Sequence, residues 1–171
     1  SLPDILSETI AVHNYSALKK ELRFNQHLEL DDNLEIFSNA FRLKLIVSNL
    51  LGNAIKYTDS GEVTIFAKID EENNKKALSI RVRDTGIGIA AEHQAHIFRQ
   101  YYMTDVQQKS AGFGLGLYIS KLWAKQLQGD ITVVSTLGEG SLFTLRIPIE
   151  HTRVKVKRFE RYLQNSLFRL S

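Results

Sequence analysis

The sequence predicts an α+β fold, a two-layer sandwich in which helices cover one face of a mixed, mostly antiparallel sheet. Before the tail, apolar residues recur at helical spacing in three separate segments, and they alternate with polar residues in three pairs of strand-like segments. A turn signal separates the members of each pair, which is typical of hairpins. The alternation also argues against a parallel sheet buried on both faces, because strands of such a sheet are apolar almost throughout.

The first part of the chain is expected to hold one helix and two short strands. Residues 4–22 carry apolar side chains at roughly helical spacing. Alternation over 28–30 and 34–37, on either side of the turn signal at 31–33, predicts the strands.

Two further helices are predicted, over 41–57 and 117–127. Asn39 is suited to cap the N-terminus of the first, and the Asp-Ser-Gly run at 59–61 ends it. Gly129 follows the end of the second helix.

Two hairpins complete the predicted fold. The first joins strands over 62–70 and 77–84 through a loop at 71–76. The second joins strands over 131–135 and 141–147 through a glycine-containing turn.

Length and composition indicate one globular domain with a short tail. The chain has 171 residues, 43% of them apolar and 24% charged, and it has no cysteine, which excludes disulfides and thiolate metal sites. The formal net charge is +3, but residues 150–171 hold six Lys and Arg against two Glu. The basic balance therefore comes from the tail and does not by itself indicate a nucleic-acid partner. We expect a domain over 1–149 and a basic amphipathic helical tail or connector over 150–171.

The helix over 41–57 carries polar residues that suit a cation and phosphates. At about 100° per residue, Asn49, Asn53 and Lys56 share one stripe of the helix. Amide oxygens and waters suit Mg²⁺, and the ammonium suits phosphate. Each residue alone also fits an ordinary solvated helix surface.

Two glycine-rich motifs follow. Asp84-Thr85-Gly86-Ile87-Gly88-Ile89 comes directly after a predicted strand, where the carboxylate can accept a hydrogen bond and glycines allow close approach of a ligand. Gly112-Phe113-Gly114-Leu115-Gly116-Leu117 opens a predicted helix, whose N-terminal N–H groups suit an anion. Its spacing fits neither the dinucleotide-binding fingerprint nor a P-loop. A plain turn and a flexible hinge are the simpler alternatives for the two motifs.

Together with Gly138-Glu139-Gly140-Ser141-Leu142-Phe143, these motifs occur in one order within one domain. The series resembles the GHKL superfamily, and specifically the catalytic ATP-binding domain of two-component sensor histidine kinases. The first box of that family is matched by Arg42-Leu43 and by Asn49-Leu50-Leu51-Gly52-Asn53-Ala54-Ile55-Lys56-Tyr57-Thr58. The resemblance implies the Bergerat type of two-layer sandwich over roughly residues 4–149.

The resemblance also implies roles for single residues. Asn53 ligates Mg²⁺ with Asn49 in support, Lys56 meets a phosphate, and Tyr57 packs on the adenine. Asp84 accepts the adenine amino hydrogen bond, Gly88 leaves room for the ring, and Ser141 assists Asp84 through water. The lid is served by Phe98 at its entry and by the glycines Gly112, Gly114 and Gly116. The nucleotide-binding set further includes Gly86, Ile89, Leu115 and Leu117.

Some positions depart from the family pattern. Gln100 and Met103 stand where the family often has Arg, so Lys109 or Arg99 is the candidate lid cation. No phosphoacceptor histidine motif is present: His13 is expected to be a surface histidine, and His93 and His96 to lie on a solvated helix face.

The resemblance thus predicts a cytoplasmic protein-histidine kinase domain, either separate or as part of a membrane-bound sensor. It would bind Mg-ATP and donate the γ-phosphoryl group to a histidine on a separate dimerisation and phosphoacceptor domain, with a response regulator downstream. It would contact neither nucleic acid nor membrane. The alternatives are a GHKL ATPase, a serine-kinase anti-sigma factor and a degenerate nucleotide-binding module. Asn49 argues against the ATPase, because the hydrolysing members usually have a general-base Glu there.

Overall fold

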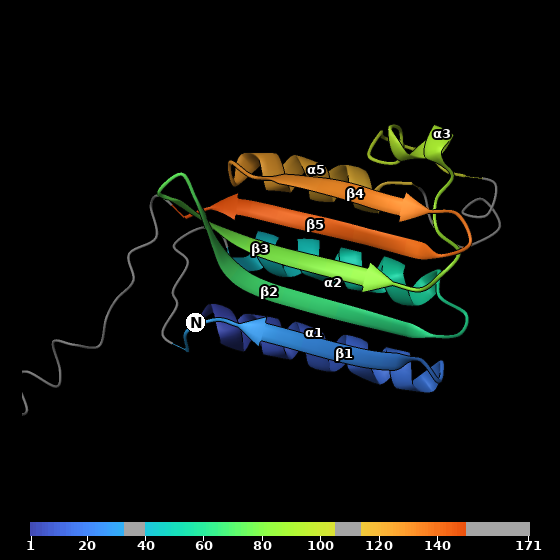
Figure 1. Cartoon of the computed structure of the whole chain (residues 1–171), viewed down its shortest axis with the longest axis horizontal. Coiled ribbons are helices and arrows are strands. Elements are labelled where there is room, and N and C mark those ends of the chain that lie inside the picture. Colours follow the sequence, from blue (N-terminus) through green and yellow to red (C-terminus); the bar gives the residue numbers. More distant parts are fainter. Residues whose placement is uncertain (33–39, 105–113, 150–171) are drawn as a thin grey trace, which may run out of the picture.

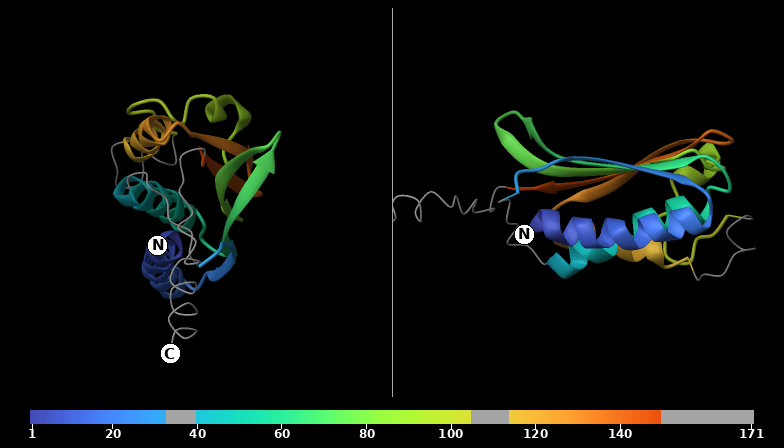
Figure 2. Two further views of the ribbon diagram at one scale, coloured as in Figure 1. Left: turned by 90° about the vertical axis from the view of Figure 1, so that its left-hand side faces the viewer. Right: turned by 90° about the horizontal axis from the view of Figure 1, so that it is seen from below.

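The computed structural model describes residues 1–32, 40–104 and 114–149. They form a five-stranded sheet and three long helices. The helices pack on one face of the sheet (Figure 1), and the two rotated views agree on this two-layer arrangement (Figure 2). In chain order the elements are α1 (Leu2–Lys19), β1 (Arg23–Glu29), α2 (Ala40–Lys56), β2 (Glu62–Glu72), β3 (Lys75–Asp84), α3 (Ala91–Gln94), α5 (Gly116–Gln126), β4 (Asp130–Thr136) and β5 (Gly140–Pro148). The predicted α+β sandwich is confirmed.

The strand order of the sheet is β1-β2-β3-β5-β4. Among the strands of the described residues, only the β1–β2 pair is parallel, with α2 in the connection between the two strands, and the other three pairs are antiparallel. A parallel pair needs such a crossover, whereas hairpins join the antiparallel pairs β2–β3 and β4–β5. The prediction of a mixed, mostly antiparallel sheet is therefore correct.

Helix α1 begins earlier than the sequence indicated because its N-terminus is capped by side chains. The Ser1 hydroxyl accepts the Asp4 backbone N–H, and Pro3 stands in the first turn, where no helical N–H is needed. The helix ends at Lys19 rather than at residue 22. Leu6 and Ile10 are buried from it.

The first strand differs most from its prediction. Strand β1 runs from Arg23 to Glu29, not over 28–30, and the predicted strand at 34–37 and the cap Asn39 lie outside the described residues. The apolar residues of β1 are only half-buried, because β1 is an edge strand. It is recognised by its parallel register with β2, which pairs Arg23 with Glu62. Sequence periodicity does not carry that information.

Both predicted hairpins are present, and the first is longer than expected. Strands β2 and β3 extend to Glu72 and Lys75, so the turn is only Asn73-Asn74. Both asparagines have positive φ angles, 52° and 60°, as a tight hairpin turn of this kind requires. In the second hairpin, β5 ends at Pro148 as predicted.

The core lies between the sheet and the helices. Helix α2 contributes most of it, and its Ile46, Val47 and Leu51 are fully buried. Ile80 of β3 and Leu145 of β5 face them from the central strands. The opposite face of the sheet is covered by no helix in the described part of the chain (Figure 2). None of the described helices combines the length and hydropathy that crossing a membrane requires.

Candidate functional site

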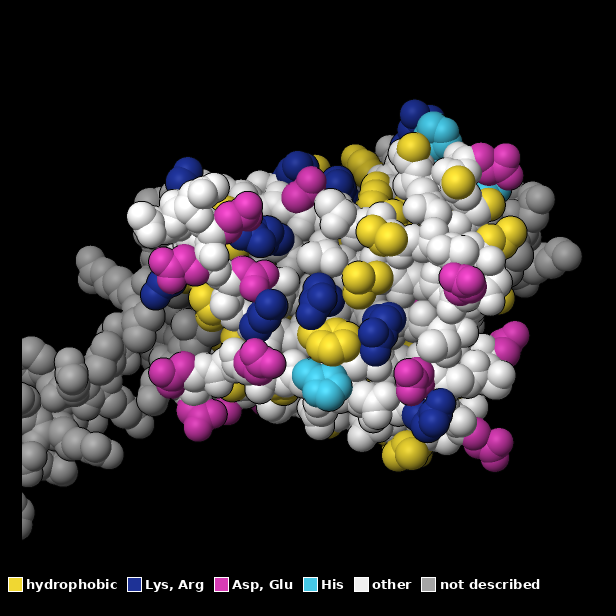
Figure 3. Space-filling model, in the orientation of Figure 1, with side chains coloured by type: hydrophobic (Ala, Val, Ile, Leu, Met, Phe, Trp, Pro, Cys, Tyr) yellow, Lys and Arg dark blue, Asp and Glu magenta, His cyan; other side chains and the backbone are white. Residues whose placement is uncertain are grey.

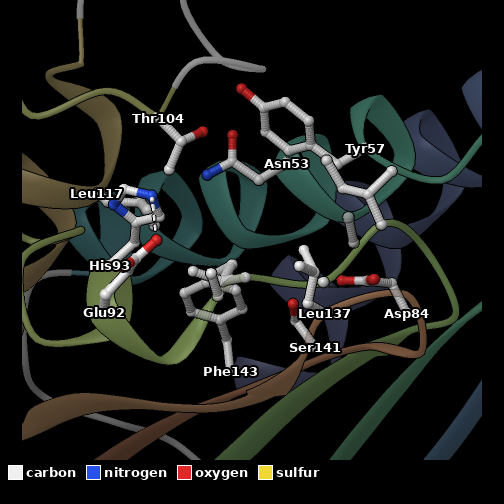
Figure 4. Close-up of a pocket in the computed structure, with 15 residues that line it drawn as sticks. Asn53, Tyr57, Asp84, Glu92, His93, Thr104, Leu117, Leu137, Ser141 and Phe143 are labelled. Atoms are coloured by element: carbon white, nitrogen blue, oxygen red, sulfur yellow. Dashed lines mark ion pairs between the residues drawn. The ribbon is translucent and has the colours of Figure 1, made fainter.

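Two cavities open beside the C-terminal end of α2, the end of β3 and the start of α5. The first has a volume of about 300 Å³ and the second about 270 Å³. Asn53, Tyr57 and Leu117 line both, so the cavities adjoin along these residues. Figure 4 shows the first cavity, with Asp84 and Ser141 at one end and Glu92, His93 and Thr104 toward the other. A combined space of this size suits a ligand of nucleotide dimensions.

Asp84 is the buried carboxylate of the first cavity. It is the last residue of β3 and only 7% exposed. Its Oδ1 accepts the backbone N–H of Gly86 at 2.9 Å. Burial raises the pKa of the Asp84 carboxyl above its ordinary value, although hydrogen bonds from the backbone of Gly86 and Ser141 oppose the rise. Asp84 can thus present an acceptor to a polar ligand in a largely apolar cavity.

Two glycines of the Asp-x-Gly-x-Gly motif hold the turn after Asp84 against its neighbours. A Cβ at Gly86 would lie 2.3 Å from the carbonyl oxygen of Tyr57, which no side chain can accommodate. Gly88 has a φ of +68°, and a Cβ there would lie 2.1 Å from the carbonyl oxygen of Thr136. The motif therefore does more than form a turn, because it brings the end of α2 and the end of β4 to the cavity.

A chain of hydroxyl groups lies beside Asp84. Ser141, opposite Asp84 in the β3–β5 register, is 8% exposed, and its Oγ lies 2.8 Å from Ser135 Oγ. Ser135 Oγ also accepts the backbone N–H of Ile89 at 2.8 Å. Ser141 lines the cavity as predicted, and its water-mediated role toward Asp84 stays a prediction. Sequence reasoning missed Ser135, since an alternating strand residue gives no sign of it.

Two residues of the polar stripe of α2 line the cavities, and the third binds α5. Asn53 lines both cavities and Lys56 the second, with the Lys56 ammonium 5.5 Å from the centre of the Tyr57 ring. Asn49 lines neither. Its amide donates to Ser120 Oγ at 2.9 Å and to the carbonyl oxygen of Gly116 at 3.3 Å, so it ties α2 to the start of α5.

The glycine-rich motif before α5 supplies a wall of the second cavity. Gly114, Leu115 and Gly116 line it, and α5 begins at Gly116. The positive end of this helix therefore lies at the cavity. Gly112 and the candidate lid cation Lys109 lie outside the described residues.

Phe98 lies behind the first cavity. Its ring packs edge-on against Phe143 at 6.2 Å between centroids, and the Lys121 ammonium lies 4.7 Å from its centre. Phe143 lines the cavity and Phe98 does not. The role of Phe98 at the entry of a lid stays a prediction.

The chain matches the model of a known protein family over most of its length. Residues 38–151, a span that contains all the motifs above, match the model of the histidine kinase-, DNA gyrase B- and HSP90-like ATPases. The chain belongs to this family.

Similar proteins place the chain more narrowly within this family. The sensor histidine kinase RcsC of Salmonella typhimurium is 36% identical over 157 residues, which are 91% of this chain and 16% of RcsC. The aerobic respiration control sensor protein ArcB of Escherichia coli is 38% identical over 150 residues, covering 84% of this chain and 19% of ArcB. The chain therefore spans less than a fifth of the length of these relatives.

Solved structures agree. Full-length ShkA, crystallised in complex with AMPPNP, has a TM-score of 0.74 and 27% identity, covering 86% of this chain and 30% of ShkA. The catalytic domain of the histidine kinase ThkA has the same fold, with a TM-score of 0.68 at 24% identity, covering 86% of this chain and 93% of ThkA. These findings confirm the resemblance that the motifs indicated.

Several residues that line the first cavity or are half-buried elsewhere were not expected from the sequence. His93 does not lie on a solvated face: it is half-buried, lines the first cavity and shares a hydrogen bond with the Tyr102 hydroxyl, so that expectation was wrong. Thr104 and Leu137 also line this cavity. His13 is half-buried as well and shares a hydrogen bond with Ser48 at 3.0 Å. Nothing in the periodicity distinguishes these side chains from surface residues.

The raised pKa of Asp84 predicts a specific pH dependence of stability. Because the folded state binds this proton more tightly than the unfolded state, Asp84 destabilises the fold as the pH rises from the ordinary Asp value of about 3.9 through the raised pKa. The gain in unfolding free energy of Asp84→Asn over the natural chain should therefore grow across this window and then level off. Urea denaturation at a series of pH values measures it, and a pH-independent difference would contradict the assignment.

Asp130 offers a control of opposite sign. Burial raises the pKa of its carboxyl, but hydrogen bonds from Lys121, Lys125 and the Ile131 backbone outweigh that and lower it overall. The stability that Asp130 contributes is thus present above the ordinary Asp pKa and lost as the pH falls through the lowered value. Asp130→Asn should therefore cost stability at neutral pH and progressively less toward acid.

Proposed function

We propose that this chain binds Mg-ATP and donates the γ-phosphoryl group to a histidine on a separate dimerisation and phosphoacceptor domain. The observation that carries the proposal is the pair of adjoining cavities. One holds a buried carboxylate acceptor, Asp84, and the other holds the amide and ammonium of Asn53 and Lys56. An adenine and a polyphosphate need these two environments side by side.

The Asp84 end is suited to the base. Its carboxylate accepts a hydrogen bond from the exocyclic amino group of adenine. Apolar residues that line the cavity, such as Ile87 and Leu137, contact the faces of the ring. Tyr57 packs on the base from α2, and Ser141 holds a water between itself and Asp84. A buried charge-assisted hydrogen bond of this kind contributes about 1.5–3 kcal/mol.

The second cavity is suited to the phosphates. Lys56 supplies a positive charge, and the N-terminus of α5 with Gly114 and Gly116 supplies backbone N–H groups. The donor set also fits Mg²⁺: the Asn53 amide lines both cavities, and Mg²⁺ commonly keeps several waters and binds through few protein oxygens and the phosphates. Asn53 would hold the ion, which neutralises phosphate charge when bound.

Asn49 favours transfer over hydrolysis. An amide cannot remove a proton from water, and here it is engaged with Ser120 and Gly116. The remaining chemistry is positioning and charge neutralisation of the transferring group. A lid between Phe98 and Gly112 would close over the phosphates, with Lys109 as its cation.

The partners follow from the similarity to sensor histidine kinases. We propose that the acceptor histidine belongs to another domain of a longer parent protein and that a response regulator receives the phosphoryl group next. The proposed location is cytoplasmic, with neither nucleic acid nor membrane contacted by this domain.

A transfer assay tests this function directly. The chain is mixed with radiolabelled Mg-ATP and a phosphoacceptor domain of a similar kinase, and the label on protein is followed. Label that is stable in alkali and labile in acid should appear on the acceptor, and not when its histidine is replaced by glutamine. Rapid release of inorganic phosphate without acceptor labelling would instead support an ATPase.

The role of Asn53 predicts a metal-dependent loss of affinity. Asn53→Ala should weaken binding of Mg-AMPPNP about tenfold in calorimetric titration, yet leave binding of metal-free AMPPNP nearly unchanged. Asn25→Ala, on the opposite face of the sheet, is the matched control and should behave like the natural chain. Equal losses with and without Mg²⁺ would remove Asn53 from the metal site.

A further inference from the structure

The face of the sheet opposite the helices carries a compact basic and aromatic cluster, formed by His27, Phe66, Arg81 and Arg83. These residues come from the adjacent strands β1, β2 and β3, with His27 paired to Phe66 and Phe66 paired to Arg81 in the strand register. Figure 3 views this face, where basic and histidine side chains surround a hydrophobic group near the centre. The cluster lies across the sheet from the nucleotide cavities.

Contacts with an aromatic ring fix the positions of the basic side chains but do not neutralise their positive charge. The His27 ring stacks on the Phe66 ring at 5.1 Å with 17° between planes, and the guanidinium carbons of Arg81 and Arg83 lie 4.9 and 5.3 Å from the centre of the same ring. Thr64, on the same face, is only 2% exposed, so the larger side chains cover the sheet there. Guanidinium groups held against an aromatic ring are preorganised to bind carboxylates.

The two arginines lack acidic partners among the described residues. They stand two positions apart on one face of β3, about 7 Å from each other along the strand, and repel one another. Two carboxylates of this face pair with other residues, Glu62 with Arg23, and Asp70 with Lys68 and Arg146, and Glu29 lies on edge strand β1, two strands away from the arginines. Binding of an anionic partner would relieve the repulsion between these two ordered positive charges.

We propose that this cluster is a docking site for an acidic segment of a partner protein, one that presents two carboxylates about 6–7 Å apart. Carboxylates two residues apart on an extended segment have this spacing, about 3.3 Å per residue. Each arginine can bind one carboxylate in a bidentate manner, and arginine is among the residues that dominate interface energies.

The charge of the alternative occupants argues against each of them. The tail over 150–171 has six basic and two acidic residues, and a second copy would present the same positive cluster, so neither is complementary. Nucleic acid or an anionic membrane would cover the whole face, including Glu62, Asp70 and Glu72 on both sides of the cluster. A short acidic segment contacts the arginines without meeting these carboxylates.

The test uses NMR of the ¹⁵N-labelled chain with a capped peptide of alternating Glu and Ser, against the same peptide with Gln for Glu. The Glu peptide should shift the amides of Phe66, Arg81 and Arg83, with a dissociation constant on the order of millimolar, and the Gln peptide should not. Arg81→Gln with Arg83→Gln should weaken binding at least fivefold. Lys75→Gln with Lys76→Gln removes the same charge from the far end of β3 and should change it less than twofold.

Several results would overturn the proposal. These are absence of shifts at the cluster, equal weakening by the two double variants, or tighter binding of duplex DNA or anionic vesicles than of the peptide at the same amides. The ¹⁵N spectrum of every variant should keep the dispersed amide signals of the natural chain, which shows that each is folded. Failure of the natural chain to bind nucleotide would refute the proposed function and leave this test intact.

Discussion

The close approach of the β3 turn to the end of α2 is the constraint on which the site depends. The backbone N–H of Ile87 donates to the carbonyl oxygen of Tyr57 at 3.2 Å. Only glycine fits at position 86, because a Cβ there would clash with the same carbonyl oxygen. Beneath it, the fully buried Thr58 hydroxyl donates to the Ala54 carbonyl at 2.7 Å and holds the last turn of the helix. Without this junction, Asp84 and the polar end of α2 would not face the same cavity.

The junction also explains why one half of the site is buried and the other half is more exposed. The sheet end brings Asp84 and Ser141, which are nearly buried, whereas the helix end brings Asn53 and Lys56. Asn49 then sets the position of α5 through Ser120, so that the positive end of α5 reaches the same space. A packing interaction and a hydrogen bond thus position groups that are distant in the sequence.

The parts of the fold that depend on local pattern could be predicted from the sequence. The long apolar repeat of α2 and the alternation in β2, β3 and β5 identified these elements, and the glycine spacing identified Asp84. What sequence reasoning missed depends on tertiary contacts. Edge strand β1 is defined by its pairing with β2, and His93 and Ser135 become part of the site only because chain segments converge. Periodicity describes one segment at a time and cannot reveal such convergence.

The two faces of the sheet carry different chemistry. The helix-covered face ends in the cavities, and the open face carries the arginine and phenylalanine cluster, separated from them by the sheet itself. A ligand in the cavities and a partner on the open face would therefore not compete for the same surface.

The proposed recognition of adenine depends on one hydrogen bond, which the amino group of the base donates to the Asp84 carboxylate. The most direct measurement compares ATP with inosine triphosphate, whose base has a carbonyl in place of that amino group, by calorimetric titration of the natural chain and of Asp84→Asn. The natural chain should bind ATP roughly tenfold to a hundredfold more tightly than inosine triphosphate, and Asp84→Asn should lose most of this preference. Equal affinity of the natural chain for both nucleotides, or an unchanged preference in Asp84→Asn, would contradict it.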